Sequence, residues 1–431
     1  MSRLRTVGHY LAARWRWSHL RGPALERFRE RHARATVEWA RSRSPASRAH
    51  WAGHDPREWR TLPTVDKRFM MTHFDTFNTR GVALDRAMEV AFRGERERDF
   101  AATVDGLTVG LSSGTSGHRG LFLVDEEERD AWAGTILARA LPAHAWRGCR
   151  IALFLRANSN LYETISGQRI AFRFFDLMTP VDRAAAEIER FGPDVLVGPP
   201  SLLKALGERV RHVPRRVVSV AETLDPDEAE RLAALWSAPV HQIYQATEGL
   251  LAVTCAAGSL HVQEDVVALQ WEDAGGGRVS PIVTDLRRRT QPIVRYRLGD
   301  LLLLDEAPCP CGSPWQRIAR IEGRRDDVLR FPGEDGVARD VYPDILRRAI
   351  LLAHPAIEDF RVVQESEGAV EISLALRADA DFTEVAESVR RSLAEVLGSY
   401  GCRAERVEVN AGLPPELPAD KRRRVRRGGG A

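Results

Sequence analysis

The pattern of hydrophobic and polar positions divides the middle of the chain into short apolar runs and longer helical stretches. The runs have strand character at 106–110, 121–124, 150–155, 194–198 and 216–220, and helical spacing occurs at 184–191 and 200–210. Regular alternation of strand and helix is typical of layered α/β folds whose strands are mostly parallel. We therefore predict an α/β core over 106–325, with ligands at the loops beyond the carboxyl ends of its strands.

The two flanks of this core have different patterns. Residues 1–105 are rich in Arg, Trp and Glu at helical spacing, which predicts a helical lead-in. Beyond Arg325 there are two helical patterns, at 341–352 and 382–397, and three strand patterns, at 358–364, 370–376 and 406–409. A segment of this length and content is enough for a separate domain. We therefore predict a small α+β domain over 326–431.

The composition narrows the classes of protein. Of 431 residues, 44% are hydrophobic and 29% are charged, as in ordinary soluble globular proteins. The longest apolar runs, such as 301–304 and 350–353, are far too short to span a bilayer. Arg14 and Arg16 interrupt the segment 10–20, which indicates an amphipathic surface helix and not a signal peptide. We therefore expect a cytoplasmic protein without a membrane span.

Positive charge is concentrated at the C-terminal end. The residues concerned are Lys421, Arg422, Arg423, Arg424, Arg426 and Arg427. The net charge of the whole chain is +3, so the remainder is net negative, which argues against a nucleic-acid-binding surface. The five cysteines are an odd number in a long chain, and this favours reduced thiols or a metal site over a disulfide framework.

The stretch 111–120 holds three glycines and four hydroxyl side chains directly after a strand-like run. Its candidate ligand-binding residues are Ser112, Ser113, Gly114, Thr115, Ser116 and Gly117, followed by Arg119. Glycine lets the backbone approach a ligand closely, and hydroxyl and amide groups donate hydrogen bonds to phosphate oxygens. A Walker loop runs into a helix, whereas this loop lies between strands. It is either an anion-binding loop or a plain hairpin turn.

Three further motifs follow this loop. They are Tyr244-Gln-Ala-Thr247-Glu248-Gly, Arg295-Tyr-Arg-Leu-Gly299-Asp300 and Glu322-Gly-Arg324-Arg-Asp326-Asp327. Taken singly, they are typical of a helix cap, a turn and a surface ion-pair cluster. Taken in order with the Ser-Ser-Gly-Thr-Ser-Gly loop, they resemble the adenylate-forming superfamily of acyl- and aryl-coenzyme A ligases. The resemblance is strongest to the phenylacetate-coenzyme A ligase-like branch, and it covers Gly106 to the C-terminus.

The resemblance implies a fold and a reaction. The implied fold is a large layered adenylation domain with mostly parallel sheets, joined to a small mobile C-terminal domain. In the implied reaction, a carboxylate attacks the α-phosphorus of ATP to give an acyl-adenylate and pyrophosphate, and a thiol then usually displaces AMP. Catalysis of the first step depends on positioning and on stabilisation of charge.

The resemblance also implies roles for individual residues. Residues 112–117 would hold the β- and γ-phosphates of ATP, Thr247 would donate to the α-phosphate, and Glu248 would hold Mg²⁺. Asp300 would accept from both ribose hydroxyls. The other implied nucleotide-site residues are Glu222 beside Ser219 at the adenine, Tyr244, Gln245, and Arg324 at the ribose or phosphate. Arg119 stands where many relatives carry a lysine, and a guanidinium also binds phosphate.

Two residues belong to the implied domain movement. Asp326 would be the hinge about which the small domain rotates. Lys421 matches the lysine that reaches the adenylate phosphate and the substrate carboxylate, a task that suits a compact charge on a flexible stem. The neighbouring arginines keep a second interpretation open, in which Lys421 belongs to a solvated basic tail.

A second constellation has the composition of a metal site. Cys255, His261, Cys309 and Cys311 are spaced as Cys-x5-His, a long gap and Cys-Pro-Cys-Gly. Thiolate and imidazole are the ligands that tetrahedral Zn²⁺ prefers, and four protein ligands would leave no open position. We predict a structural zinc site, as in some phenylacetate-ligase-like proteins. The alternative is that these four residues are ordinary core positions.

The expected partners follow from the implied reaction. They are a carboxylic acid and either coenzyme A or an acyl carrier protein, with a homodimer as a candidate assembly. The segments 154–162 and 172–176 mix aromatic and polar residues and are candidate acyl-pocket walls, or simply core. Three alternatives stay open: transfer to an amine or another nucleophile, an inactive nucleotide-binding or zinc-scaffolded protein, and binding of nucleic acid by the tail.

Overall fold

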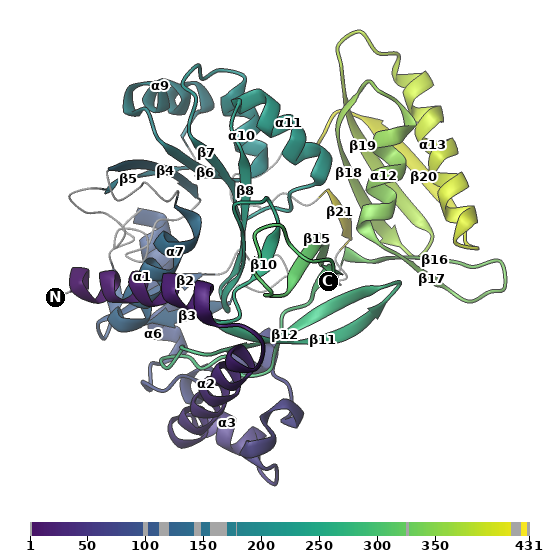
Figure 1. The fold of residues 1–431 in the computed structure, drawn as a ribbon. Coiled ribbons are helices and arrows are strands. Elements are labelled where there is room, and N and C mark those ends of the chain that lie inside the picture. Colours follow the sequence, from purple (N-terminus) through teal and green to yellow (C-terminus); the bar gives the residue numbers. More distant parts are fainter. Residues whose placement is uncertain are drawn as a thin grey trace. The chain divides into compact units, whose positions relative to one another are not determined.

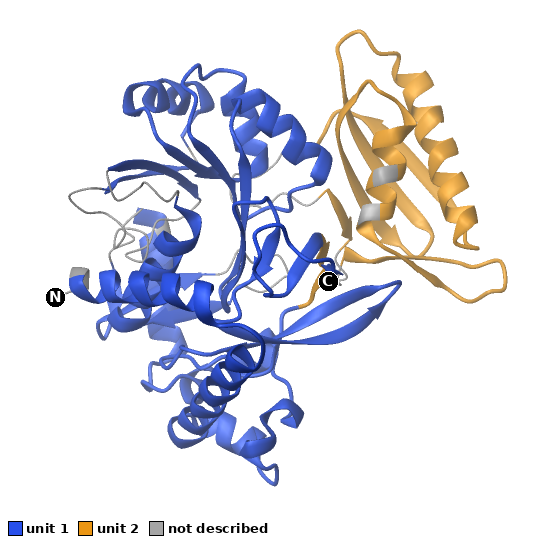
Figure 2. Ribbon diagram, viewed as in Figure 1, with its two compact units in different colours: residues 1–114, 118–298, 302–321 blue, residues 115–117, 299–301, 322–431 orange. Residues whose placement is uncertain are grey.

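The computed structural model describes residues 2–97, 102–111, 120–141, 148–155, 170–177, 179–324, 327–414 and 424–428. The chain forms two compact units (Figure 2). The second unit includes Glu322–Ala431, and the first contains nearly all of the chain before it. The passage between them falls within strand β15 (Arg317–Arg324).

Helices form the N-terminal part of the first unit. They are α1 (Ser2–His19), α2 (Gly22–Arg43), α3 (Pro45–His50), the 3-10 helix η1 (Pro56–Thr61), α4 (Lys67–Thr72), α5 (Phe74–Phe77) and α6 (Leu84–Glu97). Side-chain caps fix the starts of α3, η1 and α4, and Asp55 is the cap of η1. Ser44 accepts a hydrogen bond from the backbone N–H of Ser47 at 3.1 Å, and Asp66 accepts one from Phe69 at 2.7 Å. This part of the chain is helical, as its spacing predicts.

A twelve-stranded sheet runs through the first unit (Figure 1). Besides β15, its strands are β4 (Cys149–Leu155), β5 (Ile170–Asp176), β6 (Val195–Gly198), β7 (Arg216–Ser219), β8 (Val240–Ala246), β9 (Gly249–Thr254), β10 (Leu260–Val262), β11 (Val267–Gly275), β12 (Arg278–Asp285), β13 (Tyr296–Arg297) and β14 (Asp300–Asp305). The strand order is β11-β12-β14-β15-β10-β9-β8-β7-β6-β4-β5, and β13 pairs with β12.

The sheet changes character at β8. Pairing is parallel from β5 through β4, β6 and β7 to β8, and antiparallel from β8 to β9. Helices α9 (Val181–Phe191), α10 (Pro200–Gly207) and α11 (Pro226–Trp236) pack beside the parallel strands in a shared apolar cluster. The predicted α/β class is therefore confirmed. The sheet is mixed and not mostly parallel as expected, because its parallel pairs lie within β4–β8, whereas β9, β10 and β12 pair antiparallel with their neighbours.

The predicted phosphate loop joins two strands of a smaller sheet. Strands β1 (Thr103–Val104), β2 (Leu107–Leu111) and β3 (Leu121–Val124) pair in that order. Helix α7 (Glu126–Ala140) follows directly, and Asp125 and Glu128 form a capping box at its start. The loop between β2 and β3, 112–119, lies outside the described residues.

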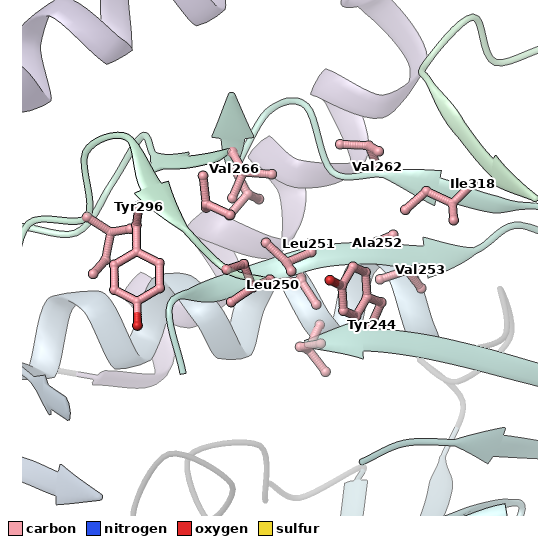
Figure 3. Close-up of a cluster of buried hydrophobic side chains, with 14 of the residues drawn as sticks. Tyr244, Leu250, Leu251, Ala252, Val253, Val262, Val266, Tyr296 and Ile318 are labelled. Carbon is pink, nitrogen blue, oxygen red and sulfur yellow. The ribbon is translucent and has the colours of Figure 1, made fainter. Parts of the chain in front are cut away.

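The largest apolar core of the first unit lies along β8, β9, β10 and β15. Tyr244, Leu251, Val253, Val262 and Ile318 are among its buried members (Figure 3). Strand β9 is apolar at nearly every position, whereas a half-exposed strand alternates apolar and polar residues. The reason is that both faces of β9 are covered. The core thus holds the turn between β8 and β9 on a rigid base.

The second unit has its own core and a small α+β fold. Strands β18 (Ile357–Ser366), β19 (Ala369–Leu376), β20 (Arg406–Ala411) and β21 (Val425–Arg427) form a sheet in the order β20-β19-β18-β21. Helices α12 (Pro343–Ala353) and α13 (Phe382–Ser399) pack on it, and β16 (Leu329–Phe331) pairs with β17 (Arg339–Val341). The predicted α+β character is confirmed. Strand β21 was not predicted, because its sequence lies within the basic run.

Candidate functional site

Thr247 and Glu248 form the two-residue turn of a β-hairpin. Ala246 at the end of β8 pairs with Gly249 at the start of β9. The Thr247 hydroxyl donates a hydrogen bond to Oε2 of Glu248 at 2.8 Å, and the Glu248 side chain is mostly buried. The interpretation of this pair as a helix cap is therefore wrong, because a strand follows it. A buried carboxylate in a tight turn is held in one orientation, as a metal-binding group must be.

Arg288 connects this turn to the strand that leaves the predicted phosphate loop. One guanidinium nitrogen donates to the carbonyl oxygen of Thr247 at 2.5 Å, and another donates to the carbonyl oxygen of Leu123 in β3 at 3.1 Å. Gln291 completes the link, since its amide accepts from the Leu123 N–H at 3.1 Å and donates to the Leu121 carbonyl at 3.2 Å. Both side chains are buried. We call Arg288 and Gln291 the turn clamp.

The turn clamp was not among the residues predicted from the sequence. Asp285 at the end of β12 accepts hydrogen bonds from the backbone N–H groups of Arg287 and Arg288 at 2.7 and 3.0 Å, and this fixes the bend that presents Arg288. A signal was available in the run Asp285-Leu-Arg-Arg-Arg. Three consecutive arginines next to an apolar strand need buried hydrogen-bond acceptors. Composition alone does not tell which groups those acceptors are.

Asp300, predicted at the ribose, and Arg324, predicted at the ribose or phosphate, lie together in the structure. Asp300 begins β14 and Arg324 ends β15, and Nε of Arg324 lies 3.4 Å from Oδ1 of Asp300. Asp326 and Lys421, together with Ser112 to Gly117 and Arg119, fall outside the described residues. Their assigned roles stay predictions.

The other predicted nucleotide-site residues, of which Ser219 and Glu222 were placed at the adenine, have mixed surroundings. Glu222 accepts from the Ser201 hydroxyl at 3.0 Å and from its backbone N–H at 3.3 Å, so it anchors the start of α10. Ser219 at the end of β7 is fully buried, and its hydroxyl has no hydrogen-bond partner among the described residues. Gln245 accepts from the Trp132 indole at 3.2 Å. Tyr244 is part of the apolar core (Figure 3).

Two predicted acyl-pocket aromatics are core residues. Phe154 and Phe175 are buried and stack with ring centroids 4.7 Å apart in the cluster beneath α9 and α10. Protein covers both rings, which agrees with the alternative that these two positions are simply core. The rest of the candidate wall, 156–162, lies outside the described part of the chain.

The predicted metal ligands converge. The ligand atoms of Cys255, His261, Cys309 and Cys311 all lie within 4.8 Å of one another. The sulfur atoms of Cys255 and Cys309 are 3.7 Å apart, and Nε2 of His261 is 3.5 Å from the Cys311 sulfur. The cysteines are free thiols and form no disulfide. Fifty-four residues separate Cys255 from Cys309, so the fold has brought both pairs to one point.

The surroundings of the four ligands favour metal binding. Nδ1 of His261 lies 2.9 Å from the carbonyl oxygen of Trp315, a bond that leaves Nε2 to face the sulfur atoms. The Trp315 indole donates to the Leu20 carbonyl at 2.9 Å, and the Trp17 ring lies edge-on to His261 with centroids 5.5 Å apart. The cluster is thus covered by the end of α1 and by Leu20, which follows that helix. It fits a closed four-ligand site.

The comparisons with known proteins agree with these features. No protein-family model matches the chain. Phenylacetate-coenzyme A ligase of Thermus thermophilus is 26% identical over 216 residues, which is 44% of this chain and 46% of that protein. Protein CapK of Staphylococcus aureus is 23% identical over 216 residues, covering 48% of this chain and 47% of its own. The chain therefore matches about half the length of these curated relatives.

Solved structures share the fold. A crystal structure of 2-hydroxyisobutyryl-CoA ligase in the postadenylation state with 2-HIB-AMP has a TM-score of 0.69 at 18% identity, covering 92% of this chain and 88% of its own. The amide bond synthetase McbA from Marinactinospora thermotolerans has a TM-score of 0.53 at 18% identity, covering 73% and 68%. The fold is that of the adenylate-forming ligases. The sequence relatives support the phenylacetate-coenzyme A ligase-like branch of that superfamily.

Proposed function

We propose that the protein activates a carboxylic acid with Mg-ATP through an acyl-adenylate and passes the acyl group to coenzyme A or a carrier-protein thiol. The observation that carries this proposal is the Thr247–Glu248 turn, which the turn clamp ties to the strand leaving the Ser/Gly loop. A phosphate loop and a metal-binding carboxylate must keep a fixed separation if both are to hold one nucleotide. The relatives and structural neighbours support the same chemistry.

The chain's own residues divide the work in this proposal. Glu248 would hold Mg²⁺, which prefers carboxylate and phosphate oxygens and would neutralise charge on the transferring phosphorus. Thr247 would donate to the α-phosphate, and Asp300 would accept from the ribose hydroxyls, with Arg324 beside it. Lys421 would supply a positive charge to the adenylate phosphate and the substrate carboxylate. The loop 112–117 and Arg119 would bind the pyrophosphate portion.

A second acceptor class has support from one neighbour. McbA is named an amide bond synthetase and shares this fold, so transfer of the acyl group to an amine is an alternative second step. The first step is the same in both cases, because adenylation precedes the choice of nucleophile. The acceptor is therefore tested separately, by offering coenzyme A and amines to an enzyme already shown to form the adenylate.

The first step is tested by trapping. With Mg-ATP and hydroxylamine, we expect at least one acid of an aryl, fatty and amino acid panel to give a hydroxamate, and the same acid to support ATP–pyrophosphate exchange. The proposal fails if Mg-ATP binds but no acid in the panel supports exchange. That outcome would favour the inactive nucleotide-binding alternative.

Arg288→Lys is expected to slow adenylation without unfolding the protein. Lysine keeps the buried positive charge but cannot reach two carbonyl oxygens with a planar fork. We expect the exchange rate to fall about 10- to 100-fold, because displacement of the turn by a fraction of an ångström misaligns the metal-binding carboxylate. The measurement is exchange kinetics together with thermal unfolding.

Arg289→Lys is the matched control for this variant. Arg289 donates to the Thr36 hydroxyl at 2.7 Å and does not contact the turn, so its exchange rate should stay near that of the wild type. Equal losses in the two variants would show that the clamp has no specific role at the turn.

We also propose that Cys255, His261, Cys309 and Cys311 hold one structural Zn²⁺. The purified protein should contain about one zinc ion per chain by elemental analysis. Cys311→Ser should lose the metal and lower the thermal midpoint, because the coordination bonds that join Cys255 and His261 to Cys309 through the metal are then absent. Cys402→Ser, which changes a buried thiol of the second unit, should retain zinc. Metal-free wild-type protein of unchanged stability would contradict the proposal.

A further inference from the structure

Helix α1 exposes four large apolar side chains to solvent. The exposed fractions of Leu4, Val7, Leu11 and Trp15 are 82%, 54%, 60% and 56%. Residues spaced by three and four positions lie on one face of a helix, so these four form a continuous stripe along α1. A surface helix of a globular protein normally buries such a stripe against the core. We call these four residues the α1 stripe.

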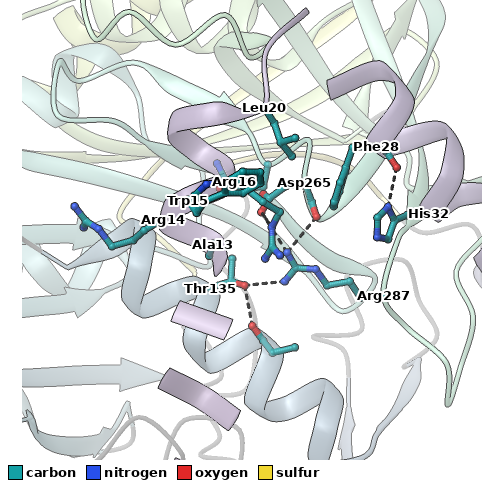
Figure 4. A network of polar contacts seen from close by, with 12 residues as sticks. Ala13, Arg14, Trp15, Arg16, Leu20, Phe28, His32, Thr135, Asp265 and Arg287 are labelled. Carbon is teal, nitrogen blue, oxygen red and sulfur yellow. Dashed lines mark hydrogen bonds and ion pairs between the residues drawn. The ribbon is translucent and has the colours of Figure 1, made fainter. Parts of the chain in front are cut away.

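The opposite face of α1 is fixed to the protein by charged groups. Arg5 forms ion pairs with Asp130 at 2.9 Å and with Glu126 at 2.6 Å, and Arg16 pairs with Asp265 at 2.7 Å. Figure 4 shows Arg16 pointing toward Asp265 while Arg14 points away from it. Rolling the helix to bury the stripe would break these ion pairs. The outward orientation of the stripe is therefore built into the fold.

The packing of α1 on α7 enforces the same orientation. Gly134 of α7 lies so close to α1 that an added Cβ would be 2.6 Å from the carbonyl oxygen of Thr6 and 2.8 Å from the backbone nitrogen of Tyr10. Thr6 and Ala13, on this inner face, are buried. The two helices are thus in backbone contact. No space remains there for the larger side chains of the stripe.

The charged residues of α1 indicate what kind of surface the stripe can bind. The helix sequence contains four arginines, two histidines and no aspartate or glutamate. Arg14 is exposed next to the stripe and lies over the Tyr10 ring, 5.9 Å from its centroid. The carboxylates of Glu126, Asp130 and Asp265 meet the helix on its inner face, through Arg5 and Arg16. The outer face is therefore apolar, with Arg14 as the positive charge described at its margin.

These features of α1 match a binding partner whose surface is both apolar and negatively charged. Exposures of this size leave on the order of 500 Å² of apolar surface, whereas each partner of a stable dimer buries about 800 Å². Two copies joined through the stripe would also place two helices without a carboxylate side by side, with like charges facing. Neither objection applies to an anionic bilayer. Its headgroups pair with Arg, and the boundary of its acyl chains accommodates the stripe.

We propose that α1 is an interfacial helix that binds the protein to anionic lipid bilayers, with Leu4, Val7, Leu11 and Trp15 inserted at the headgroup boundary. The helix lies in the plane of the surface and does not cross it, which agrees with the finding that no helix in the described chain is long and apolar enough to span a membrane. A Trp at the end of the stripe suits this depth, since its ring is apolar and its N–H is polar. The binding is independent of the proposed adenylation chemistry.

The test is sedimentation of the full-length protein with vesicles. We expect binding to vesicles of equal parts phosphatidylglycerol and phosphatidylcholine at least about tenfold stronger than to phosphatidylcholine alone. The double variant Val7→Gln/Leu11→Gln keeps every charge, including the basic C-terminal run, and should lower binding about tenfold or more. ATP–pyrophosphate exchange in that variant should be unchanged, so failure here and failure of the adenylation proposal can be told apart.

The matched control is Val337→Gln/Leu352→Gln, which changes exposed apolar residues of the second unit, with exposed fractions of 58% and 71%. It should bind anionic vesicles like the wild type. The proposal is overturned if the wild-type protein ignores anionic vesicles. It is also overturned if the α1 variant binds as well as wild type, which would assign binding to the basic tail, or if it converts a dimer to a monomer in light scattering.

Discussion

Replacing Glu248 by glutamine is expected to lower the rate of ATP–pyrophosphate exchange by about 10²- to 10³-fold. The glutamine amide has the same shape and its oxygen can still accept the hydrogen bond from the Thr247 hydroxyl, which spans 2.8 Å in the wild type. The turn should therefore keep its conformation. What the variant loses is the negative charge that a hard cation such as Mg²⁺ requires.

The measurement is exchange at several Mg²⁺ concentrations, with an acid that gives a hydroxamate. The half-saturating Mg²⁺ concentration should rise in Glu248→Gln. Glu208→Gln, which removes an exposed carboxylate that pairs with Arg209 at 3.6 Å, serves as the control and should leave both quantities unchanged. An unaltered rate and an unaltered Mg²⁺ dependence in Glu248→Gln would refute the metal-binding role.

Asp265→Ala is expected to cost about 3–5 kcal/mol of unfolding free energy. Asp265 is completely buried and forms ion pairs with Arg16 at 2.7 Å, Arg139 at 3.1 Å and Arg287 at 3.2 Å (Figure 4 shows Arg16 and Arg287). Burial lowers the pKa of Arg287 to about 10, so this guanidinium still carries its charge at neutral pH. Removal of the carboxylate leaves three guanidinium groups close together without compensation.

The measurement is urea unfolding of the variant and the wild type. The matched control is Glu272→Ala, which breaks the partly exposed pair with Arg297 at 2.8 Å and should cost less than about 1 kcal/mol. Similar losses in the two variants would show that Asp265 does not organise the contact of α1 with the rest of the first unit.

The same carboxylate predicts the acid dependence of stability. Burial by itself would raise the pKa of Asp265, but Arg139, Arg287 and Arg16 outweigh burial and hold the pKa below its usual value. A group with a lowered folded-state pKa stabilises the protein fully above its unfolded pKa, and this stabilisation is lost as the pH falls. The difference in unfolding free energy between wild type and Asp265→Ala should therefore shrink below about pH 4.

Much of the architecture could be predicted because it depends on local periodicity. The helix predicted at 382–397 is α13 (Phe382–Ser399), and the strand predicted at 370–376 is β19 (Ala369–Leu376). Strand β21 could not be predicted in this way. Its residues are basic, and it forms because Val425 and its neighbours pair with the open edge of β18, a partner far away in the sequence.

The candidate site was predicted in part. Residues that belong to a recognisable motif could be predicted, and residues outside the motifs could not. The spacing of Cys255, His261, Cys309 and Cys311 named a complete ligand set, and the fold brings the four side chains together. The Tyr-x-x-Thr-Glu motif named Thr247 and Glu248, but not the hairpin that holds them. Residues that act on a motif from elsewhere in the chain, such as Arg288, carry no mark in the motif itself.

The sequence by itself determined the α/β class, the small α+β region, the order of the four motifs and the side-chain types of the Cys/His set, because these follow from residue type and from spacing along the chain. Only the tertiary structure decided which distant groups meet. It pairs Arg16 with Asp265 across 249 positions, sets Arg288 between Thr247 and Leu123, and turns the apolar stripe of α1 outward. Burial makes such contacts specific, because a buried charge or donor must find its partner wherever the fold places it.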